Sequence, residues 1–220
     1  MRVFCDFDGT IAKLDVTDYV LSQLADPKWE VLEEGWLAGR MTAAACMRAQ
    51  VELIGGSDAD LDAVLDAVEL DDGFADFVAW CRRRQLDLTI VSDGVDYFIR
   101  RVLKRHGLDG LSVVSNRLAG REMRRHLEQP WARAGCAAGS GVCKCEVLRP
   151  SGATPAGPAV FIGDGRSDFC ASARADILFA KSKLAEYAAA RGQAFHPFSD
   201  FHDVLAQLAG MAGGIGAVAV

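Results

Sequence analysis

Short runs of apolar residues recur along the chain, each bounded by turn-forming or charged residues, with segments of helical spacing between them. The runs are Val3 to Phe7, Leu86 to Val91, Leu111 to Val114, Ala159 to Ile162 and Ile177 to Ala180. Over residues 74–81 and 97–105, apolar side chains recur three and four positions apart, as in an amphipathic helix. Alternation of buried strands with helices predicts a parallel sheet covered on both faces. We therefore expect a doubly wound α/β core.

One stretch interrupts the alternation. From Val16 to Leu70 no segment has a strand pattern, and four segments have helical spacing: Tyr19 to Leu24, Val31 to Leu37, Thr42 to Leu53, and Asp58 to Val68. Ser57 followed by Asp60 is a capping pattern for the last of them. We therefore predict two domains: a core formed by residues 1–15 and 71–220, and a helical cap formed by residues 16–70 and inserted after the first strand.

Three further segments are irregular. Residues 116–141 hold five arginines, Trp131 and several glycines, which favours a surface hairpin or flap. Gly152 to Pro158 reads as a turn-rich linker into the fourth strand. The tail from Gly210 to Val220 is apolar but too short to cross a bilayer, so no membrane association is expected. The tail could pack on a neighbour, and the sequence leaves monomer and homodimer open.

Composition excludes several classes of protein. With 220 residues, of which 50% are hydrophobic and 25% charged, the chain can bury a good core and is not disordered. The net charge of −6 disfavours nucleic acid as a partner, because phosphate backbones are bound by an excess of Lys and Arg. The seven cysteines are an odd number, and no secretion signal precedes the first strand. Free thiols in a reducing cytoplasm are therefore expected.

The most informative residues are Asp6 and Asp8, in the run VFCDFDGT. A buried strand followed by Gly9 and Thr10 puts both carboxylates just past the carboxyl edge of a parallel sheet, where ligands bind in such folds. Two like charges so close repel each other unless a cation lies beside them, and Mg²⁺ takes oxygen ligands. The alternative is an acidic turn at a strand end.

Two more segments with candidate site residues follow along the chain. The second apolar run leads into Ser92, Asp93 and Gly94, whose hydroxyl and backbone N–H groups could bind a phosphoryl group or simply cap a helix. Lys144 stands at a predicted helix N-terminus after a glycine-rich approach. A lysine there opposes the helix dipole, which favours a nearby anion.

The last such segment is FIGDGRSD, which places Asp164 at a strand edge and Asp168 at the start of the next helix. Asp164 could complete the oxygen shell of the cation, while Asp168 pairs with Lys144 and holds its ammonium toward the site. Both carboxylates fall at the same sheet edge as Asp6 and Asp8, which weakens the alternative of an ordinary acidic turn.

In this order, DFDGT, Ser92, Lys144 and GDGRSD resemble the four motifs of the haloacid dehalogenase superfamily. The resemblance covers nearly the whole chain. It implies a Rossmann-like, three-layer α/β/α core with a small helical cap, and a Mg²⁺-dependent phosphatase acting on a small phosphorylated metabolite through an aspartyl-phosphate. The implied roles are nucleophile for Asp6, general acid and base for Asp8, phosphoryl ligands for Ser92 and Lys144, and Mg²⁺ ligands for Asp6, Asp164 and Asp8, the last through its backbone carbonyl.

The segments GVCKCEVLR, FIGDGRSDFCASARADILFAK and HPFSDFHDVLAQL narrow the resemblance to the subgroup that contains phosphoserine phosphatase and the 2-hydroxy-3-keto-5-methylthiopentenyl-1-phosphate phosphatase of methionine salvage. Asp93 stands where that subgroup has a glycine. The resemblance implies further substrate-proximal residues: Thr10, Asp93, Gly94, Asn116 and the insert arginine Arg48. Trp131 lies in the same region as Asn116, and a packing role for it is equally compatible with the sequence.

Two other functions fit the same residues: a phosphotransferase or mutase on this scaffold, and a catalytically silent protein that binds a phosphorylated metabolite. The presence of Asp6, Asp8, Lys144 and Asp164 together argues against the silent form.

A zinc site at Cys136, Cys143 and Cys145, near His126, is a further interpretation. Their spacing is not that of paired CxxC ligands. Because Cys143 and Cys145 flank Lys144, metal ligation there would be expected to displace it. The sequence therefore favours free thiols.

Overall fold

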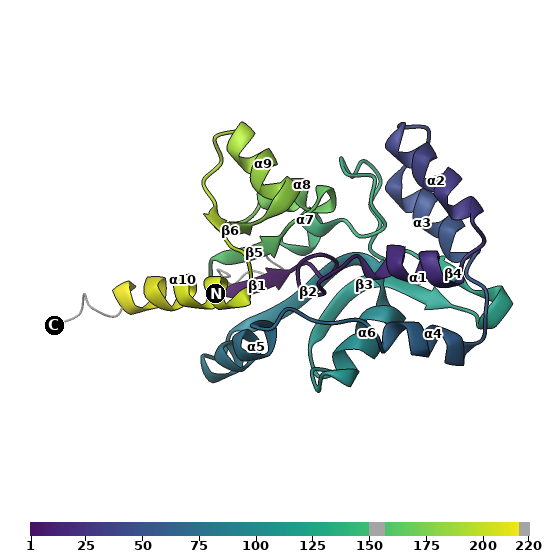
Figure 1. Cartoon of the computed structure of the whole chain (residues 1–220). Coiled ribbons are helices and arrows are strands. Elements are labelled where there is room, and N and C mark those ends of the chain that lie inside the picture. The colour runs from purple at the N-terminus through teal and green to yellow at the C-terminus, as the bar shows by residue number, and fades with distance from the viewer. Residues whose placement is uncertain (150–156, 216–220) are drawn as a thin grey trace.

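A sheet crosses the middle of the molecule and carries helices on both faces (Figure 1). The computed structural model describes residues 1–149 and 157–215, and within them the sheet has seven strands in the order β4-β3-β2-β1-β5-β6-β7. Neighbouring strands pair in parallel, except that β4 is antiparallel to β3. The strands are β1 (Arg2–Cys5), β2 (Asp87–Val95), β3 (Ser112–Ala119), β4 (His126–Glu128), β5 (Ala159–Gly163), β6 (Ile177–Ala180) and β7 (His196–Pro197). The doubly wound α/β core predicted from the apolar runs is confirmed.

Side chains that alternate along each strand enter two different cores. On β1, Val3 and Cys5 face one apolar cluster and Phe4 faces the other. The first cluster includes residues of α5 (Phe74–Arg83), α6 (Asp96–Arg105) and α10 (Phe201–Ile215). The second includes residues of α8 (Phe169–Ser172) and α9 (Ser182–Ala190), and Leu148 just after α7 (Lys144–Val147). Strands buried on both faces give the continuous apolar runs seen in the sequence.

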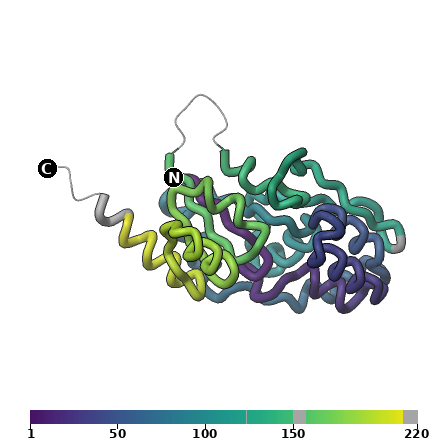
Figure 2. Tube along the Cα trace, turned by 90° about the horizontal axis from the view of Figure 1, so that it is seen from above, coloured from purple at the N-terminus to yellow at the C-terminus, as the bar shows by residue number. Residues whose placement is uncertain are grey.

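The stretch without strand pattern forms four helices, α1 (Val16–Leu24), α2 (Lys28–Leu37), α3 (Ala43–Val51) and α4 (Asp58–Leu65). We refer to residues 16–70 as the helical insert. The predicted cap of α4 is present: the Ser57 hydroxyl accepts the Asp60 N–H, and the Asp60 carboxylate accepts the Ser57 N–H. The insert lies at the end of the molecule opposite α10 (Figure 2).

Strands β2 and β3 both run farther than their apolar runs predict. Beyond Val91 the pairing of β2 with β3 is irregular, and it resumes at Val95 opposite Asn116. Because the residues in between are Ser92, Asp93 and Gly94, hydropathy alone could not mark this stretch as strand. Strand β3 then continues to Ala119 and turns through the 3₁₀ helix η1 (Glu122–Arg124) into β4, so the irregular arginine-rich region begins with a hairpin.

Two of the expected irregular segments fall partly outside the described residues. The predicted linker, Gly152 to Pro158, is described only at its last two residues, and the apolar tail only as far as α10 extends. Within residues 1–149 and 157–215, no helix combines the length and the apolar character that crossing a membrane requires.

Candidate active site

A cavity of about 560 Å³ opens between the carboxyl edge of the sheet and the helical insert. From the core it is lined by Asp6 and Asp8 after β1, by Asp93 and Gly94 of β2, and by Asp164 after β5. These residues are distant in sequence and meet because parallel strands present their carboxyl ends at one edge. The structure thus brings together the carboxylates predicted at three strand ends.

Lys144 is the centre of the buried charge network. Its Nζ donates to Asp6 Oδ1 at 2.6 Å, to Asp168 Oδ1 at 2.6 Å and to Ser167 Oγ at 3.0 Å. The side chain is completely buried, and burial alone would lower its pKa; the charges of Asp168 and Asp6 outweigh this and raise the pKa. Lys144 is therefore a permanent cation inside the site.

Asp168 does not reach the cavity, but it holds two parts of the site in place. One oxygen pairs with Lys144, and the other accepts the backbone N–H groups of Asp164 and Gly165 at 3.0 and 3.1 Å. The predicted pairing of Asp168 with Lys144 is present. This pairing connects Lys144, the lysine of the third motif, to the loop of the fourth motif.

Asp6, Asp164 and Asp168 have carboxylate oxygens within 4.8 Å of one another, and among the described residues no other set of three or more His, Cys, Asp or Glu side chains is so close. Burial first, and then the charge of Asp168, raise the pKa of both Asp6 and Asp164 above the usual range. The hydroxyl of Thr10 donates to Asp164 Oδ1 at 2.9 Å and fixes that side chain. A hard divalent cation would relieve this concentration of negative charge, and oxygen donors of this kind fit Mg²⁺.

Asp8 is held by a residue of the insert. Its Oδ1 accepts the N–H of Val16, the first residue of α1, at 2.9 Å, and its Oδ2 accepts the Ser92 hydroxyl at 3.3 Å. Burial, followed by the nearby charge of Asp15, raises the pKa of Asp8 well above its usual value. A carboxyl that keeps its proton toward neutral pH can act as a general acid.

The second strand supplies a small polar nest. The Ser92 hydroxyl accepts the N–H of Gly94 at 2.9 Å, and the Asp93 carboxylate accepts the N–H of Val142 at 2.8 Å. Asn116 is buried behind them and donates through its amide to the carbonyl and carboxylate of Asp93. Asp93 therefore links β2 to the segment before Lys144, a contact that its place in the sequence did not indicate.

Several residues expected near the substrate do not reach the cavity. Arg48 on α3 is exposed and donates to the Gln129 side chain, away from the lining residues. Asn116 is buried behind Asp93 and does not line the cavity either. Trp131 is 40% exposed, and its carbonyl accepts the N–H of Cys143. Trp131 thus contacts the segment before Lys144 through its backbone, and its side chain belongs to neither apolar cluster and does not line the cavity.

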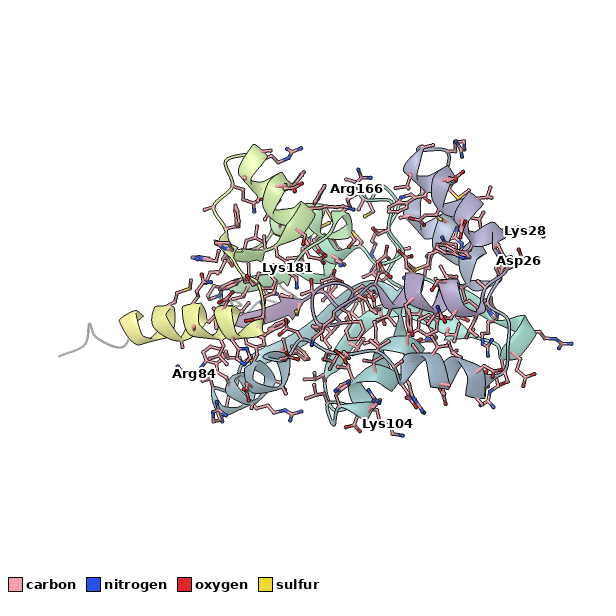
Figure 3. All side chains as sticks on the ribbon, viewed as in Figure 1. Asp26, Lys28, Arg84, Lys104, Arg166 and Lys181 are labelled. Carbon is pink, nitrogen blue, oxygen red and sulfur yellow. The ribbon has the colours of Figure 1, made fainter. Side chains whose placement is uncertain are left out.

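The insert provides the opposite wall, which sequence patterns missed. That wall combines the carboxylates of Asp18 and Glu33 and the amide of Gln50 with apolar side chains, those of Trp36, Leu37 and Met47, and Asp15 lines the cavity just before the insert begins. Arg166 and Lys183 are basic residues of the core that also line the cavity, and Figure 3 shows Arg166 between the core helices and α2 and α3. Helical periodicity marked these insert residues only as parts of helices, because nothing local tells which face meets a cavity.

Glycines permit the close packing of these carboxylates. A Cβ on Gly94 would lie 2.6 Å from Asp8 Oδ2, and a Cβ on Gly163 would lie 2.5 Å from Asp168 Oδ2. Gly9 adopts φ of +69°, and its Cβ would lie 2.7 Å from Asp164 Oδ2. The glycines of the motifs thus leave room for the acidic side chains.

Comparisons with known proteins agree with this arrangement. Residues 3–173 match the model of the haloacid dehalogenase-like hydrolase family. The chain is 33% identical to a 2-hydroxy-3-keto-5-methylthiopentenyl-1-phosphate phosphatase of Geobacillus thermodenitrificans, with 94% of each chain covered. It is 30% identical to the protein of the same name from Brevibacillus brevis, with 92% of each covered.

Solved structures support the fold. A phospho-aspartyl intermediate analogue of phosphoserine phosphatase superposes with a TM-score of 0.66 at 16% identity, over 94% of this chain and 97% of that one. A substrate-bound phosphoserine phosphatase gives 0.67 over the same shares of the two chains. By its family match, its sequence relatives and its fold, the chain belongs to the haloacid dehalogenase-like hydrolases and is a phosphatase of that family.

Proposed function

We propose that this phosphatase is a Mg²⁺-dependent phosphomonoesterase that hydrolyses a small phosphorylated metabolite through a phosphoryl intermediate on Asp6. The observation that carries the proposal is the position of the Asp6 carboxylate, at the cavity floor, 2.6 Å from Lys144 Nζ and beside Asp164. Asp6 and Asp164 would hold the cation, with the backbone carbonyl of Asp8. When bound, Mg²⁺ supplies positive charge that stabilises the oxygens of the phosphoryl group.

In the first step, a carboxylate oxygen of Asp6 attacks phosphorus, and the ester bond to the leaving oxygen breaks. Asp8, whose pKa is raised by burial, gives its proton to that oxygen as it leaves. Lys144 and the Ser92 hydroxyl would bind the phosphoryl oxygens and offset their charge. The products of this step are the alcohol and a phosphoryl group on Asp6.

In the second step, Asp8 is a carboxylate and takes a proton from water, which attacks the phosphorus. The bond from phosphorus to Asp6 breaks, and inorganic phosphate leaves. Asp8 is protonated again, so the site returns to its starting state. The Val16 N–H that Asp8 accepts comes from the insert, so the position of this acid depends on the contact between the insert and the core.

Residues 16–70 would act as a cap that selects the leaving group, over a core of residues 1–15 and 71–220. Trp36, Leu37 and Met47 of the insert line the cavity, which suits a leaving group with an apolar part. The same wall carries Asp18 and Glu33, with Asp15 next to it, and lacks Arg48, so it offers poor recognition of a free carboxylate such as that of phosphoserine. We therefore favour a metabolite like that of the 2-hydroxy-3-keto-5-methylthiopentenyl-1-phosphate phosphatases.

The test is hydrolysis of p-nitrophenyl phosphate with and without Mg²⁺, followed by a panel that contains 2-hydroxy-3-keto-5-methylthiopentenyl-1-phosphate and phosphoserine. Asp6→Asn is expected to lower kcat by at least about 10³-fold, because the nucleophile is lost. The matched control is Asp109→Asn, an exposed aspartate remote from the cavity, which should retain wild-type kcat. Mass spectrometry of rapidly quenched wild type should detect one added phosphoryl group. Full activity of Asp6→Asn would refute the mechanism.

A further inference from the structure

The wall that the helical insert presents to the cavity contains polar side chains that the proposed phosphoryl transfer does not use. Glu33 lies on α2, Gln50 on α3 and Thr17 on α1, and all three line the cavity. The phosphoryl group is assigned to Lys144 and Ser92 of the core, so these insert residues would meet the part of the substrate that leaves with the ester oxygen. Any role for them therefore rests on the proposed phosphomonoesterase function.

Gln50 holds the carboxylate of Glu33 in place. Gln50 is 4% exposed, and its Nε2 donates to Glu33 Oε2 at 3.0 Å and to the Trp29 carbonyl at 3.4 Å. Because both partners are acceptors, only the nitrogen of the amide can face them. The Cys46 thiol lies 3.9 Å from the same Glu33 oxygen. Helices α2 and α3 lie side by side (Figure 1), so the Glu33 carboxylate is held from the neighbouring helix.

The other carboxylate oxygen of Glu33 is free to accept a hydrogen bond. Within residues 1–149 and 157–215, Glu33 Oε1 has no hydrogen-bond partner, and Glu33 forms no ion pair. The side chain is only partly buried, because it lines the cavity. A carboxylate that is fixed through one oxygen can use the second to accept a strong hydrogen bond from a ligand.

Thr17 supplies a hydroxyl that has no partner. The residue is 4% exposed, and among the described residues its buried Oγ1 makes no hydrogen bond. A buried hydroxyl without a partner lowers stability, and native proteins rarely leave one unless a ligand or a water molecule completes it. Because Thr17 lines the cavity, an oxygen atom of the substrate is a suitable partner.

The charges of the insert wall restrict the leaving group. Among the described lining residues, the insert contributes the charged side chains of Asp18 and Glu33, whereas Arg166 and Lys183 come from the core. A leaving group with a carboxylate or a second phosphate would meet two like charges, and an ammonium cannot accept a hydrogen bond from Thr17. A hydroxyl can donate to Glu33, and a hydroxyl or carbonyl oxygen can accept from Thr17. The wall therefore fits an uncharged leaving group that carries oxygen atoms.

We propose that Glu33 and Thr17 form a subsite for the leaving group, in which Glu33 accepts a hydrogen bond from a hydroxyl and Thr17 donates one to a hydroxyl or carbonyl oxygen. Gln50 is the positioning residue that holds Glu33. The substrates are then monophosphates of uncharged alcohols that carry at least one further hydroxyl, with an apolar part against Trp36 and Met47. Neither Glu33 nor Thr17 takes part in bond breaking, so both act on specificity.

The test compares pentyl phosphate with the hydroxypentyl phosphates that carry one hydroxyl on carbon 2, 3 or 4. The ratio of the two kcat/KM values in one preparation does not depend on how much of the enzyme is folded, because both substrates meet the same active sites. For wild type, at least one hydroxypentyl phosphate should exceed pentyl phosphate by about 10-fold or more, as expected for a hydrogen bond to a charged group.

Variants of the subsite should change this ratio. Glu33→Met removes the carboxylate but keeps an unbranched side chain, and should bring the ratio close to 1, whereas Glu33→Gln keeps an oxygen acceptor and should retain part of the preference. Thr17→Val, which removes the hydroxyl, and Gln50→Leu, which removes the amide that holds Glu33, should each lower the ratio several-fold. The matched control is Glu34→Met, an exposed neighbour on α2 outside the lining, which should keep the wild-type ratio.

Three results would overturn the proposal. They are a wild-type ratio near 1 for every hydroxypentyl phosphate, equal ratios in Glu33→Met and Glu34→Met, and a higher kcat/KM for the matching aminopentyl phosphates, which would indicate an ammonium site. Hydrolysis of p-nitrophenyl phosphate by the same preparations separates this outcome from failure of the proposed function. If that hydrolysis requires Mg²⁺ and Asp6 while the ratio stays near 1, only the subsite is refuted.

Discussion

At Gly94, the addition of a single Cβ atom would disturb side chains that the proposed chemistry uses. It lies in the cavity wall beside Asp8 and Ser92, and a Cβ there would lie 2.6 Å from Asp8 Oδ2 and 3.0 Å from Ser92 Oγ. Real Cβ atoms do not approach oxygen so closely, so one of the two side chains would have to move. Both are held by hydrogen bonds, Asp8 by Val16 and Ser92 by Gly94 itself.

Gly94→Ala is therefore expected to lower kcat by about 10²-fold, since displacement of a reacting group by about 1 Å can cost that much. Steady-state kinetics on p-nitrophenyl phosphate will measure it. The control is Gly210→Ala, on α10, where an added Cβ meets no atom within 4 Å. Unchanged kcat in Gly94→Ala would mean that Asp8 does not act from the position described.

Between elements, Arg125 connects the β3–β4 hairpin to the insert. Its guanidinium donates to the carbonyls of Gly55 and Gly56, each at 3.0 Å, and to Asp58 Oδ1 at 2.8 Å. The side chain is nearly fully buried although it belongs to a turn. The planar guanidinium thus donates hydrogen bonds to two backbone carbonyls and one carboxylate at the same time. A lysine ammonium cannot reproduce this geometry.

Arg125→Lys should lower the free energy of unfolding by about 1–3 kcal/mol through the lost bonds to the two carbonyls. Urea denaturation of the variant against wild type measures the change. Its neighbour Arg124, which is exposed, provides the matched control Arg124→Lys, expected to be nearly neutral. Equal effects of the two substitutions would show that the hairpin is not held to the insert through Arg125.

On the scale of the whole molecule, the cavity concentrates carboxyl groups whose pKa values are raised, with burial as the largest cause in each case. They are Asp6, Asp8, Asp15, Asp18, Asp93 and Asp164. A carboxyl with a higher pKa in the folded chain binds more protons there than in the unfolded chain. Its favourable contribution is complete below the unfolded pKa and is lost as pH rises through the folded pKa. The cavity therefore opposes folding at neutral pH when no cation is bound.

Asp15 allows this to be measured: its side chain keeps contact with solvent, but the protein packed around it reduces its hydration and, followed by the charge of Asp18, raises its pKa from 3.8 to about 6. Asp15→Asn removes that titration. Without added divalent cation, the variant should be more stable than wild type at pH 7, and the difference should shrink as pH falls from about 6 toward 4. Urea unfolding across this range measures it, with Asp109→Asn as the control that shows no such pH dependence. A difference that stays constant with pH would contradict the assignment.

Much of the molecule followed from local patterns. The apolar runs located β1, β2, β3, β5 and β6, and the bounds of β6 agree with its run at both ends. The four motifs indicated the family and could be read in order along the sequence, because glycine and aspartate at a strand end are local signals. Ser57 and Asp60 predicted the start of α4, since both partners of an N-terminal capping box lie within four residues of each other.

Tertiary structure decided what depends on contacts between distant segments. The sequence located Asp6 and Lys144 separately, and only the fold brings their side chains together. It also leaves Arg48 outside the cavity lining and places carboxylates of the insert opposite Asp8. Hydropathy records whether a side chain is buried, and periodicity records which face it shares with its neighbours. Neither pattern indicates which distant element covers that face. The packing of that element determines which charged and ligating side chains meet at each site.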